Sequence, residues 1–71
     1  MLKVYIQNLD KRELFYPENT TLEEILKDVR SELPYPIYVA KLDNAYRTLT
    51  HQISHDSTIE FLDLRNQEAW Q

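Results

Sequence analysis

The sequence predicts a small α+β domain in which one helix packs on one face of a mixed β-sheet, in the order β-β-α-β-β-β. Three observations lead to this prediction. Apolar and polar residues alternate near both ends of the chain, as they do in half-buried strands. One stretch between them carries its apolar residues at helical spacing. Prolines and turn-forming polar residues separate these segments.

The N-terminal part of the chain predicts a β-hairpin. Residues 2–7 alternate apolar with polar or aromatic side chains, which indicates a strand with one buried face. A polar turn at 8–11 leads into a second strand at 12–16. Pro17 ends this strand, because proline cannot donate a hydrogen bond to a strand ladder. The facing of the second strand stays open, since either Phe15 or its two neighbours could point inward.

Residues 21–33 predict one amphipathic helix. Thr21 and Glu24 have the spacing of a capping box, in which each side chain bonds to the backbone N–H of the other residue. The apolar residues of this stretch fall on one helical face. They are Leu22, Ile25, Leu26, Val29 and Leu33. Pro34 and Pro36 prevent the helix from continuing.

The next segment predicts a second hairpin. Residues 37–42 form the third strand, and residues 45–49 return as a short fourth strand. Between them, Asp43 and Asn44 form a two-residue turn, because both residue types tolerate positive φ.

The last strand is predicted at 58–64, after a polar loop at 50–57 that has one apolar anchor at Ile53. A right-handed crossover over the helix would place this strand beside the first, in the middle of the sheet. One helix on a five-stranded mixed sheet of this order is the ubiquitin-like β-grasp arrangement.

Composition excludes several classes of function. The chain has 71 residues, a net charge of −4 and neither cysteine nor glycine. Without glycine neither a P-loop nor a dinucleotide-binding loop can form, and without cysteine there is no disulfide or thiolate metal site. The scattered Lys and Arg residues do not form the basic face that strong independent binding to nucleic acid requires. We expect a cytoplasmic chain with no membrane contact, because no signal-peptide pattern and no apolar stretch of roughly 20 residues is present.

Two stretches resemble the TGS domain, a β-grasp module of threonyl-tRNA synthetases, certain GTPases and guanosine-tetraphosphate synthetases. The first is TTLEEILKDV, at the start of the predicted helix. In the second, at 38–63, the sequence Ala-Lys-Leu, then Leu49, Ile53 and the run Asp-Ser-Thr-Ile-Glu follow in the order of that family. Asn44 stands near the family's glycine, so the tip of the hairpin departs from the pattern.

The ending IEFLDLRNQEAW resembles one branch more closely, the TGS-like domain that precedes the kinase domain in bacterial uridine-kinase-like proteins. The resemblance covers about residues 2–66 and implies a TGS-like β-grasp domain at 1–64. Residues 65–71 are then a tail or the start of a linker to a downstream region.

The resemblance also implies a function. The chain is expected to be a non-catalytic accessory or regulatory domain of a larger nucleotide-metabolising enzyme, with no catalytic, metal-binding or cofactor-binding residue of its own. Its expected partners are the downstream domains of the same polypeptide and a nucleotide or other small ligand. Two alternatives stay open, a free-standing ubiquitin-like protein-interaction module and a nucleotide- or RNA-binding module.

The sheet itself suggests an interaction site. If the apolar residues of the first and last strands face the helix, Tyr5 and Leu62 face away from it. If the alternate residues of the third strand face inward, Ile37 and Val39 also lie outside. Tyr5, Val39 and Leu62 would then form an apolar patch on the open face of the sheet, and such patches mark interaction sites.

Lys41 and Arg47 flank the turn of the second hairpin and are candidate phosphate contacts. Ordinary surface charge is the simpler explanation, because neither a glycine nest nor a helix N-terminus accompanies them.

Three further patterns in the sequence do not predict a carrier tail, a metal site or a catalytic site. A β-grasp carrier protein ends in a thin Gly-Gly tail, whereas this chain ends in Trp70 and Gln71. His51 and His55 lie four residues apart in a loop that does not predict a helix, so we expect no metal site there. The consecutive Ser-His-Asp at 54–56 does not suggest a catalytic relay, because sequence neighbours rarely adopt its geometry.

Overall fold

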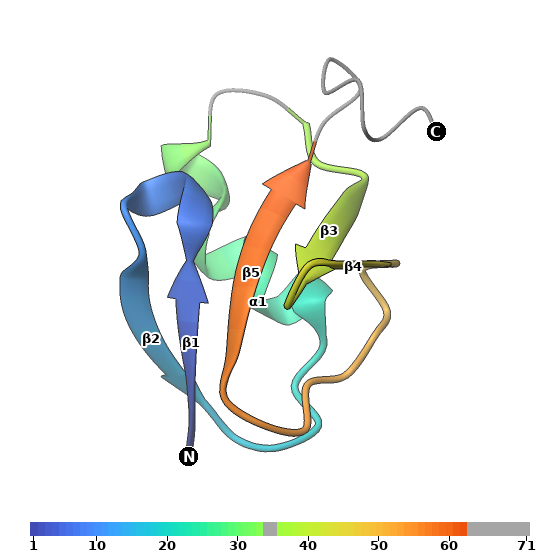
Figure 1. Ribbon diagram of the computed structural model, residues 1–71. Coiled ribbons are helices and arrows are strands. Elements are labelled where there is room, and N and C mark those ends of the chain that lie inside the picture. Colours follow the sequence, from blue (N-terminus) through green and yellow to red (C-terminus); the bar gives the residue numbers. More distant parts are fainter. Residues whose placement is uncertain (34–35, 63–71) are drawn as a thin grey trace.

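The computed structural model describes residues 1–33 and 36–62. Its elements are β1 (Leu2–Ile6), η1 (Gln7–Leu9), β2 (Arg12–Tyr16), α1 (Leu22–Val29), η2 (Arg30–Glu32), β3 (Val39–Leu42), β4 (Ala45–Arg47) and β5 (Ser57–Leu62), where η marks a 3₁₀ turn. The strands form one mixed sheet in the order β2-β1-β5-β3-β4 (Figure 1). This confirms the predicted α+β class and element order. The end of the predicted last strand at 63–64 and the tail at 65–71 lie outside the described residues.

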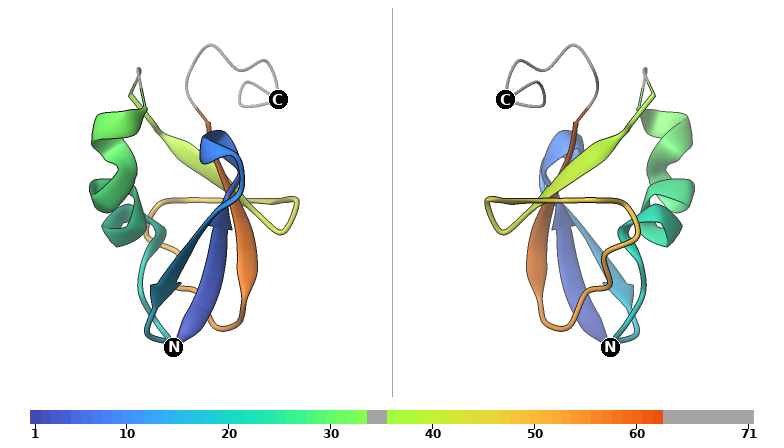
Figure 2. Two further views of the ribbon diagram at one scale, coloured as in Figure 1. Left: turned by 90° about the vertical axis from the view of Figure 1, so that its left-hand side faces the viewer. Right: turned by 90° about the vertical axis from the view of Figure 1, so that its right-hand side faces the viewer.

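β5 lies in the middle of the sheet although it comes last in the chain. It pairs in parallel with β1 and antiparallel with β3, as the predicted crossover requires. The hairpins β1–β2 and β3–β4 complete the two sides of the sheet. α1 covers one face of the sheet, here termed the inner face, and leaves the opposite, outer face without a helix (Figure 2). This arrangement is β-grasp-like.

α1 begins at the predicted capping box. The Thr21 hydroxyl accepts a hydrogen bond from Glu24 N at 3.2 Å, and Glu24 Oε1 accepts one from Thr21 N at 3.1 Å. All five apolar residues of the predicted stripe are buried. The α-helix itself ends at Val29, and η2 continues the chain to Leu33, where the backbone becomes extended.

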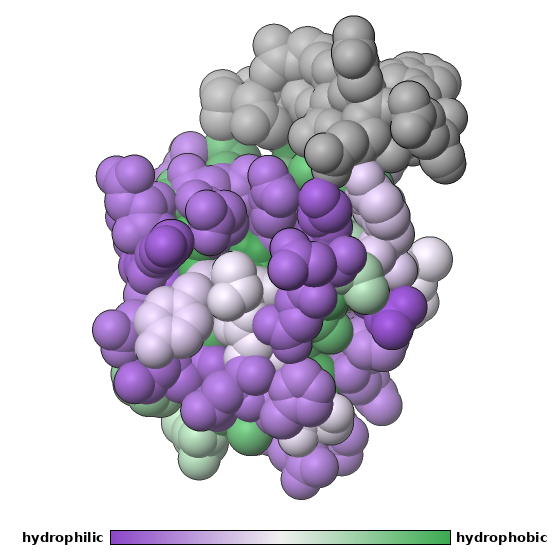
Figure 3. All heavy atoms as spheres, in the orientation of Figure 1, coloured by the Kyte–Doolittle hydropathy of each residue, from purple (hydrophilic) through white to green (hydrophobic). Residues whose placement is uncertain are grey.

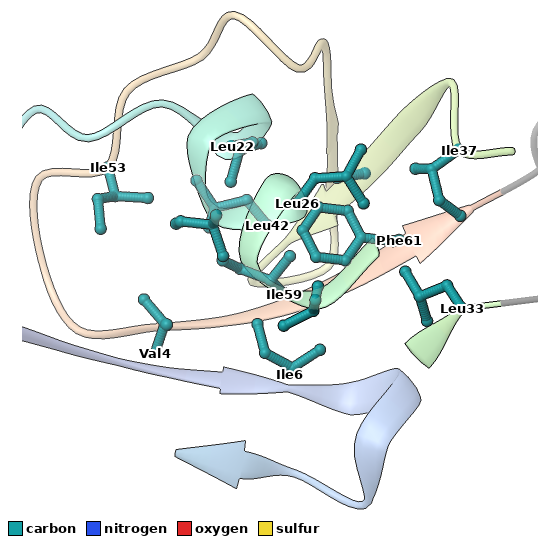
Figure 4. Packing of buried hydrophobic residues seen from close by; sticks show 13 residues of the cluster. Val4, Ile6, Leu22, Leu26, Leu33, Ile37, Leu42, Ile53, Ile59 and Phe61 are labelled. Atoms are coloured by element: carbon teal, nitrogen blue, oxygen red, sulfur yellow. The ribbon is translucent and has the colours of Figure 1, made fainter. Parts of the chain in front are cut away.

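The core lies between α1 and the inner face of the sheet (Figure 4). Val4 and Ile6 enter it from β1, and Ile59 and Phe61 enter it from β5. Since these four side chains alternate along their strands, the intervening residues point to the outer face.

Two details of facing are settled by this core. Leu14 and Tyr16 pack against it, whereas Phe15 is exposed, so of the two open alternatives β2 adopts the one in which the neighbours of Phe15 point inward. The expectation that Ile37 lies outside with Val39 is wrong, because Ile37 is only 8% exposed and belongs to the core. β3 begins at Val39, so strand alternation does not extend back to Ile37.

The loop between β4 and β5 closes the N-terminal end of α1. Leu22 N donates to His51 O at 3.0 Å, and Glu23 N donates to Leu49 O at 2.8 Å. Glu24 N donates to the Thr21 hydroxyl, and the N–H of Thr21 itself donates to Glu24 Oε1. All four N–H groups that a helix leaves unpaired at its start therefore have acceptors.

Ile53 anchors this loop, as predicted, and its side chain is fully buried. Its carbonyl accepts from Asn19 N at 2.9 Å, and its N–H donates to Thr20 O at 2.9 Å. The loop is thus bound to the segment before α1 through both its backbone and its side chain.

Asn8 continues the β1–β5 ladder with its side chain. Its Nδ2 donates to Phe61 O at 2.9 Å, and its Oδ1 accepts from Phe61 N at 2.8 Å. β1 ends at Ile6, where η1 turns the backbone away, so the carboxamide of Asn8 replaces the next peptide group of the ladder. The sequence pattern indicated only a turn residue at this position.

Residues other than glycine occupy every positive-φ position in the described chain. They are Asp10, Lys11, Asn19, Asp43 and Asn44. Asp43 and Asn44 confirm the predicted two-residue turn. Lys11, at φ 58°, is unexpected, because it lacks the short polar side chain that makes this conformation tolerable.

Replacing Lys11 by glycine should stabilise the protein. We expect Lys11→Gly to raise the free energy of unfolding by about 0.5 kcal/mol, since relief of the left-handed conformation outweighs the added freedom of the unfolded chain. Urea unfolding would measure the change. Lys27→Gly, on the exposed side of α1, is the matched control and should lower the free energy by about 1 kcal/mol. A loss of that size in both variants would contradict the prediction.

Removing the Asn8 carboxamide should weaken the sheet. We expect Asn8→Ala to lower the free energy of unfolding by about 1–3 kcal/mol, because both backbone groups of Phe61 lose their partner. Gln7→Ala, at the exposed neighbouring position, should change it by less than about 0.5 kcal/mol. Equal urea midpoints for the two variants would show that Asn8 is only a turn residue.

Candidate functional site

The outer face of the sheet carries charged and aromatic side chains. Strand alternation and register place these residues on it: Lys3, Tyr5, Glu13, Phe15, Lys41, Tyr46, Thr58 and Glu60. Hydrophilic residues cover most of this face in Figure 3. Phe15 and Tyr46 are well-exposed rings among these residues, at 55% and 45%.

The predicted patch of Tyr5, Val39 and Leu62 does not form a continuous apolar surface. All three side chains point to the outer face, but Leu62 is only 2% exposed and adds almost no surface. The cross-strand pair Lys41–Glu60 lies between the Val39–Leu62 pair and the part of β5 that adjoins Tyr5. A charged pair thus interrupts the patch, which residue alternation alone does not reveal.

Lys3 lies at the centre of the contacts on the half of the outer face that β1 and β2 form. Its Nζ lies 5.9 Å from the centroid of the Tyr5 ring, 6.0 Å from that of Phe15 and 3.6 Å from Glu13 Oε1. The Tyr5 phenol and the Glu13 carboxylate raise the pKa of the Lys3 ammonium group. Lys3 therefore stays protonated beside two rings, at distances typical of cation–π contacts.

A shallow hollow of about 370 Å³ opens in the other half of the outer face, beside the β3–β4 turn. Its lining residues are Gln7, Lys41, Asp43, Asn44, Thr58 and Glu60. Lys41 Nζ lies 5.5 Å from the centroid of the Tyr46 ring, and Lys41 stands opposite Glu60 in the register. Asp43 Oδ1 accepts from Thr58 N at 2.9 Å. Two carboxylates around one ammonium give the hollow a negative balance, which disfavours phosphate.

The structure does not bring Lys41 and Arg47 together as a phosphate site. Lys41 stands opposite Tyr46 on the outer face, whereas Arg47 stands opposite Ala40, which is fully buried on the inner face. Opposed residues share a face, so the two cations leave the hairpin on opposite sides. Arg47 instead donates to the Tyr46 carbonyl at 3.2 Å. The N-terminus of α1 offers no alternative anion site, because its donors are already paired.

The side chain of His55 meets those of a serine and an aspartate beside the start of β5, but these are Ser57 and Asp43 and not the neighbours at 54 and 56. Ser57 Oγ lies 3.1 Å from His55 Nδ1, and Asp43 Oδ2 lies 3.8 Å from the same nitrogen. A nucleophilic relay needs the hydroxyl and the carboxylate on different ring nitrogens. Ser57 also donates to the His55 carbonyl at 2.8 Å. The cluster is therefore a hydrogen-bonded turn and not a catalytic relay. Sequence spacing could not predict it, because Asp43 lies in the β3–β4 turn, far from His55 along the chain.

In residues 1–33 and 36–62, no group of three or more His, Cys, Asp or Glu side chains is placed so that it could hold a metal ion. No helix in the same residues has the length and apolarity needed to cross a membrane. His51 contributes its backbone carbonyl to the start of α1, and His55 belongs to the turn before β5.

Two side-chain contacts bind β2 to the helical segment. The Tyr16 hydroxyl donates to Asp28 Oδ2 at 2.7 Å, and Arg12 forms an ion pair with Glu32. Burial and the bond to Asp28 raise the pKa of the Tyr16 phenol. The hydrogen bond from Arg12 lowers the pKa of Glu32.

Comparison with known proteins gives no family assignment. Neither the scan against protein-family models nor the search of the curated proteins returned a match.

The contact between β2 and η2 should depend on pH. Because the pKa of Glu32 is lowered in the folded protein, its contribution to stability is present above about pH 4.5 and is lost as the pH falls through the folded value. We expect Glu32→Gln to unfold more easily than the wild type at pH 7, and the difference between the two to be smaller at pH 3. Thermal unfolding at both pH values would measure this.

Glu18→Gln is the control for that comparison, because Glu18 is exposed and lies outside the contact between β2 and η2. The difference in unfolding temperature between Glu18→Gln and the wild type should change less with pH than the difference between Glu32→Gln and the wild type. A constant difference between Glu32→Gln and the wild type at both pH values would contradict the assigned role of the ion pair.

Proposed function

We propose that this chain is a TGS-like accessory domain that binds, and does not catalyse, within a larger uridine-kinase-like enzyme of the cytoplasm. The positions in the fold of the stretches that resemble the TGS domain support this proposal. TTLEEILKDV forms the capped start and body of α1, Ala-Lys-Leu lies in β3, and Asp-Ser-Thr-Ile-Glu leads into β5.

The observation that carries the binding role is the outer face. Phe15 and Tyr46 are exposed on β2 and β4, and each ring lies within 6.0 Å of a lysine ammonium group. An exposed aromatic ring offers a partner a large contact area at a low cost in side-chain entropy. We take the partner to be a downstream domain of the same polypeptide, which would cover this face of the sheet.

A second candidate function is binding of a small polar ligand in the hollow beside the β3–β4 turn. Gln7, Asn44 and Thr58 are among its lining residues, and side chains of these types can both donate and accept hydrogen bonds. The carboxylates of Asp43 and Glu60 disfavour phosphate, so the moiety that fits is the base or sugar of a nucleoside.

A titration of the ¹⁵N-labelled chain with the separately expressed downstream region tests the proposed function. We expect amide shifts on the outer face, and about tenfold weaker binding for Phe15→Ser and for Tyr46→Ser, as for interface anchors. Arg30→Ser, at the exposed first residue of η2, is the matched control and should bind as the wild type does.

Two results would overturn the proposal. One is a full reading frame with no region downstream of the domain, which would favour the free-standing interaction module. The other is binding that is unchanged by both aromatic substitutions. Shifts confined to Gln7, Asn44 and Thr58 upon addition of uridine would favour the second candidate function.

A further inference from the structure

β2 forms one edge of the sheet. Within the described residues its only neighbouring strand is β1, and Figure 2 shows its other side turned away from the sheet. Glu13 and Phe15 are exposed on this strand. An edge strand presents backbone donors and acceptors to which another extended chain can pair.

One hydrogen bond shows which backbone groups of β2 face outward. Lys3 N donates to Asp56 Oδ1, just before β5, so the backbone groups of Lys3 and Tyr5 face β5. Backbone direction alternates along a strand, so the groups of Val4 between them face β2. Val4 stands opposite Leu14 in the register.

The same alternation then applies along β2. Leu14, with its neighbours at 12 and 16, directs its N–H and C=O toward β1. The N–H and C=O groups of Glu13 and Phe15 therefore point away from the sheet. These four groups are the pairing positions at this edge.

The inner side of this edge is bordered by carboxylates. A hollow of about 360 Å³ lies between the end of β2 and α1, and its lining residues are Tyr16, Pro17, Thr20, Glu24, Lys27 and Asp28. Glu24 and Asp28 lie one helical turn apart on the side of α1 that faces β2, since Asp28 bonds to Tyr16. Their two carboxylates outnumber the single ammonium group of Lys27, so the charge of the hollow stays negative. The outer side of the edge carries the exposed ring of Phe15.

The geometry points to an extended peptide that adds to β2 as a further strand, with basic side chains on the inner side and apolar side chains on the outer side. Side chains of an added strand alternate between the two faces. Those opposite Tyr16 would lie near the carboxylates of Glu24 and Asp28, and those opposite Phe15 would contact its ring.

Charge distinguishes this partner from a second copy of the chain. Each copy carries a net charge of −4, and pairing of β2 with β2 would bring both carboxylate-bordered edges together. A basic partner instead lowers the electrostatic energy of the contact. The inference does not rest on the proposed function, because the peptide pairs with the backbone edge of β2, although the ring of Phe15 belongs to both contacts.

The test uses a capped heptapeptide that alternates lysine and valine. We expect it to shift the amide signals of Glu13 and Phe15 in the ¹⁵N-labelled chain, and a glutamate–valine counterpart to leave them unchanged. Glu13→Pro removes one outward N–H without touching the β1–β2 ladder and should weaken binding by about fivefold or more. Glu13→Ala removes the same carboxylate but keeps the N–H, and should change binding by less than about twofold.

A second pair of variants keeps the test decisive if Glu13→Pro does not fold. Asp28→Asn should weaken binding of the lysine–valine peptide by about threefold, whereas Glu23→Gln, which does not line the hollow, should not. Equal binding of a composition-matched peptide without alternation would overturn the inference. So would unchanged binding to Glu13→Pro, or concentration-dependent dimers of the chain alone that this substitution abolishes.

Discussion

The hydrogen bonds between the β4–β5 loop and the start of α1 are the contacts on which the arrangement of this domain depends. Leu49 and His51 supply carbonyl acceptors to the helix, and Ile53 is buried beneath the same loop. A helix of only eight residues has little stability of its own, so its position over the sheet depends on packing and on this junction. The same contacts occupy the donors at its N-terminus, which leaves the sheet and its edges as the surfaces for recognition.

Much of the fold could be predicted from the sequence because its signals are local. The capping box, the apolar stripe and the Asp43–Asn44 turn each depend on residues within a few positions of one another. Asn8 could not be predicted in this way, because its partner Phe61 is 53 residues away along the chain. Ile37 was misplaced because the strand begins later than the run of apolar residues suggests.

The candidate site was less predictable for a related reason. Tyr5, Val39 and Leu62 were assigned to the correct face, but the charged pair across β3 and β5 becomes visible only when the register is known. Lys41 and Arg47 are close in sequence, yet register sends them to opposite faces. The sequence therefore determines the facing of single strands better than it determines which residues become neighbours.

The absence of glycine limits how far this domain could change its backbone conformation when it binds a partner. Each left-handed turn position in the described chain holds an aspartate, asparagine or lysine, whose backbone visits fewer conformations than glycine. A protein that closes a loop over its partner bends at hinge residues, which must adopt new backbone angles. The turns of this chain are poorly suited to act as such hinges. An extended peptide that adds to β2, as proposed above, would therefore bear most of the ordering entropy, with the domain as a rigid template.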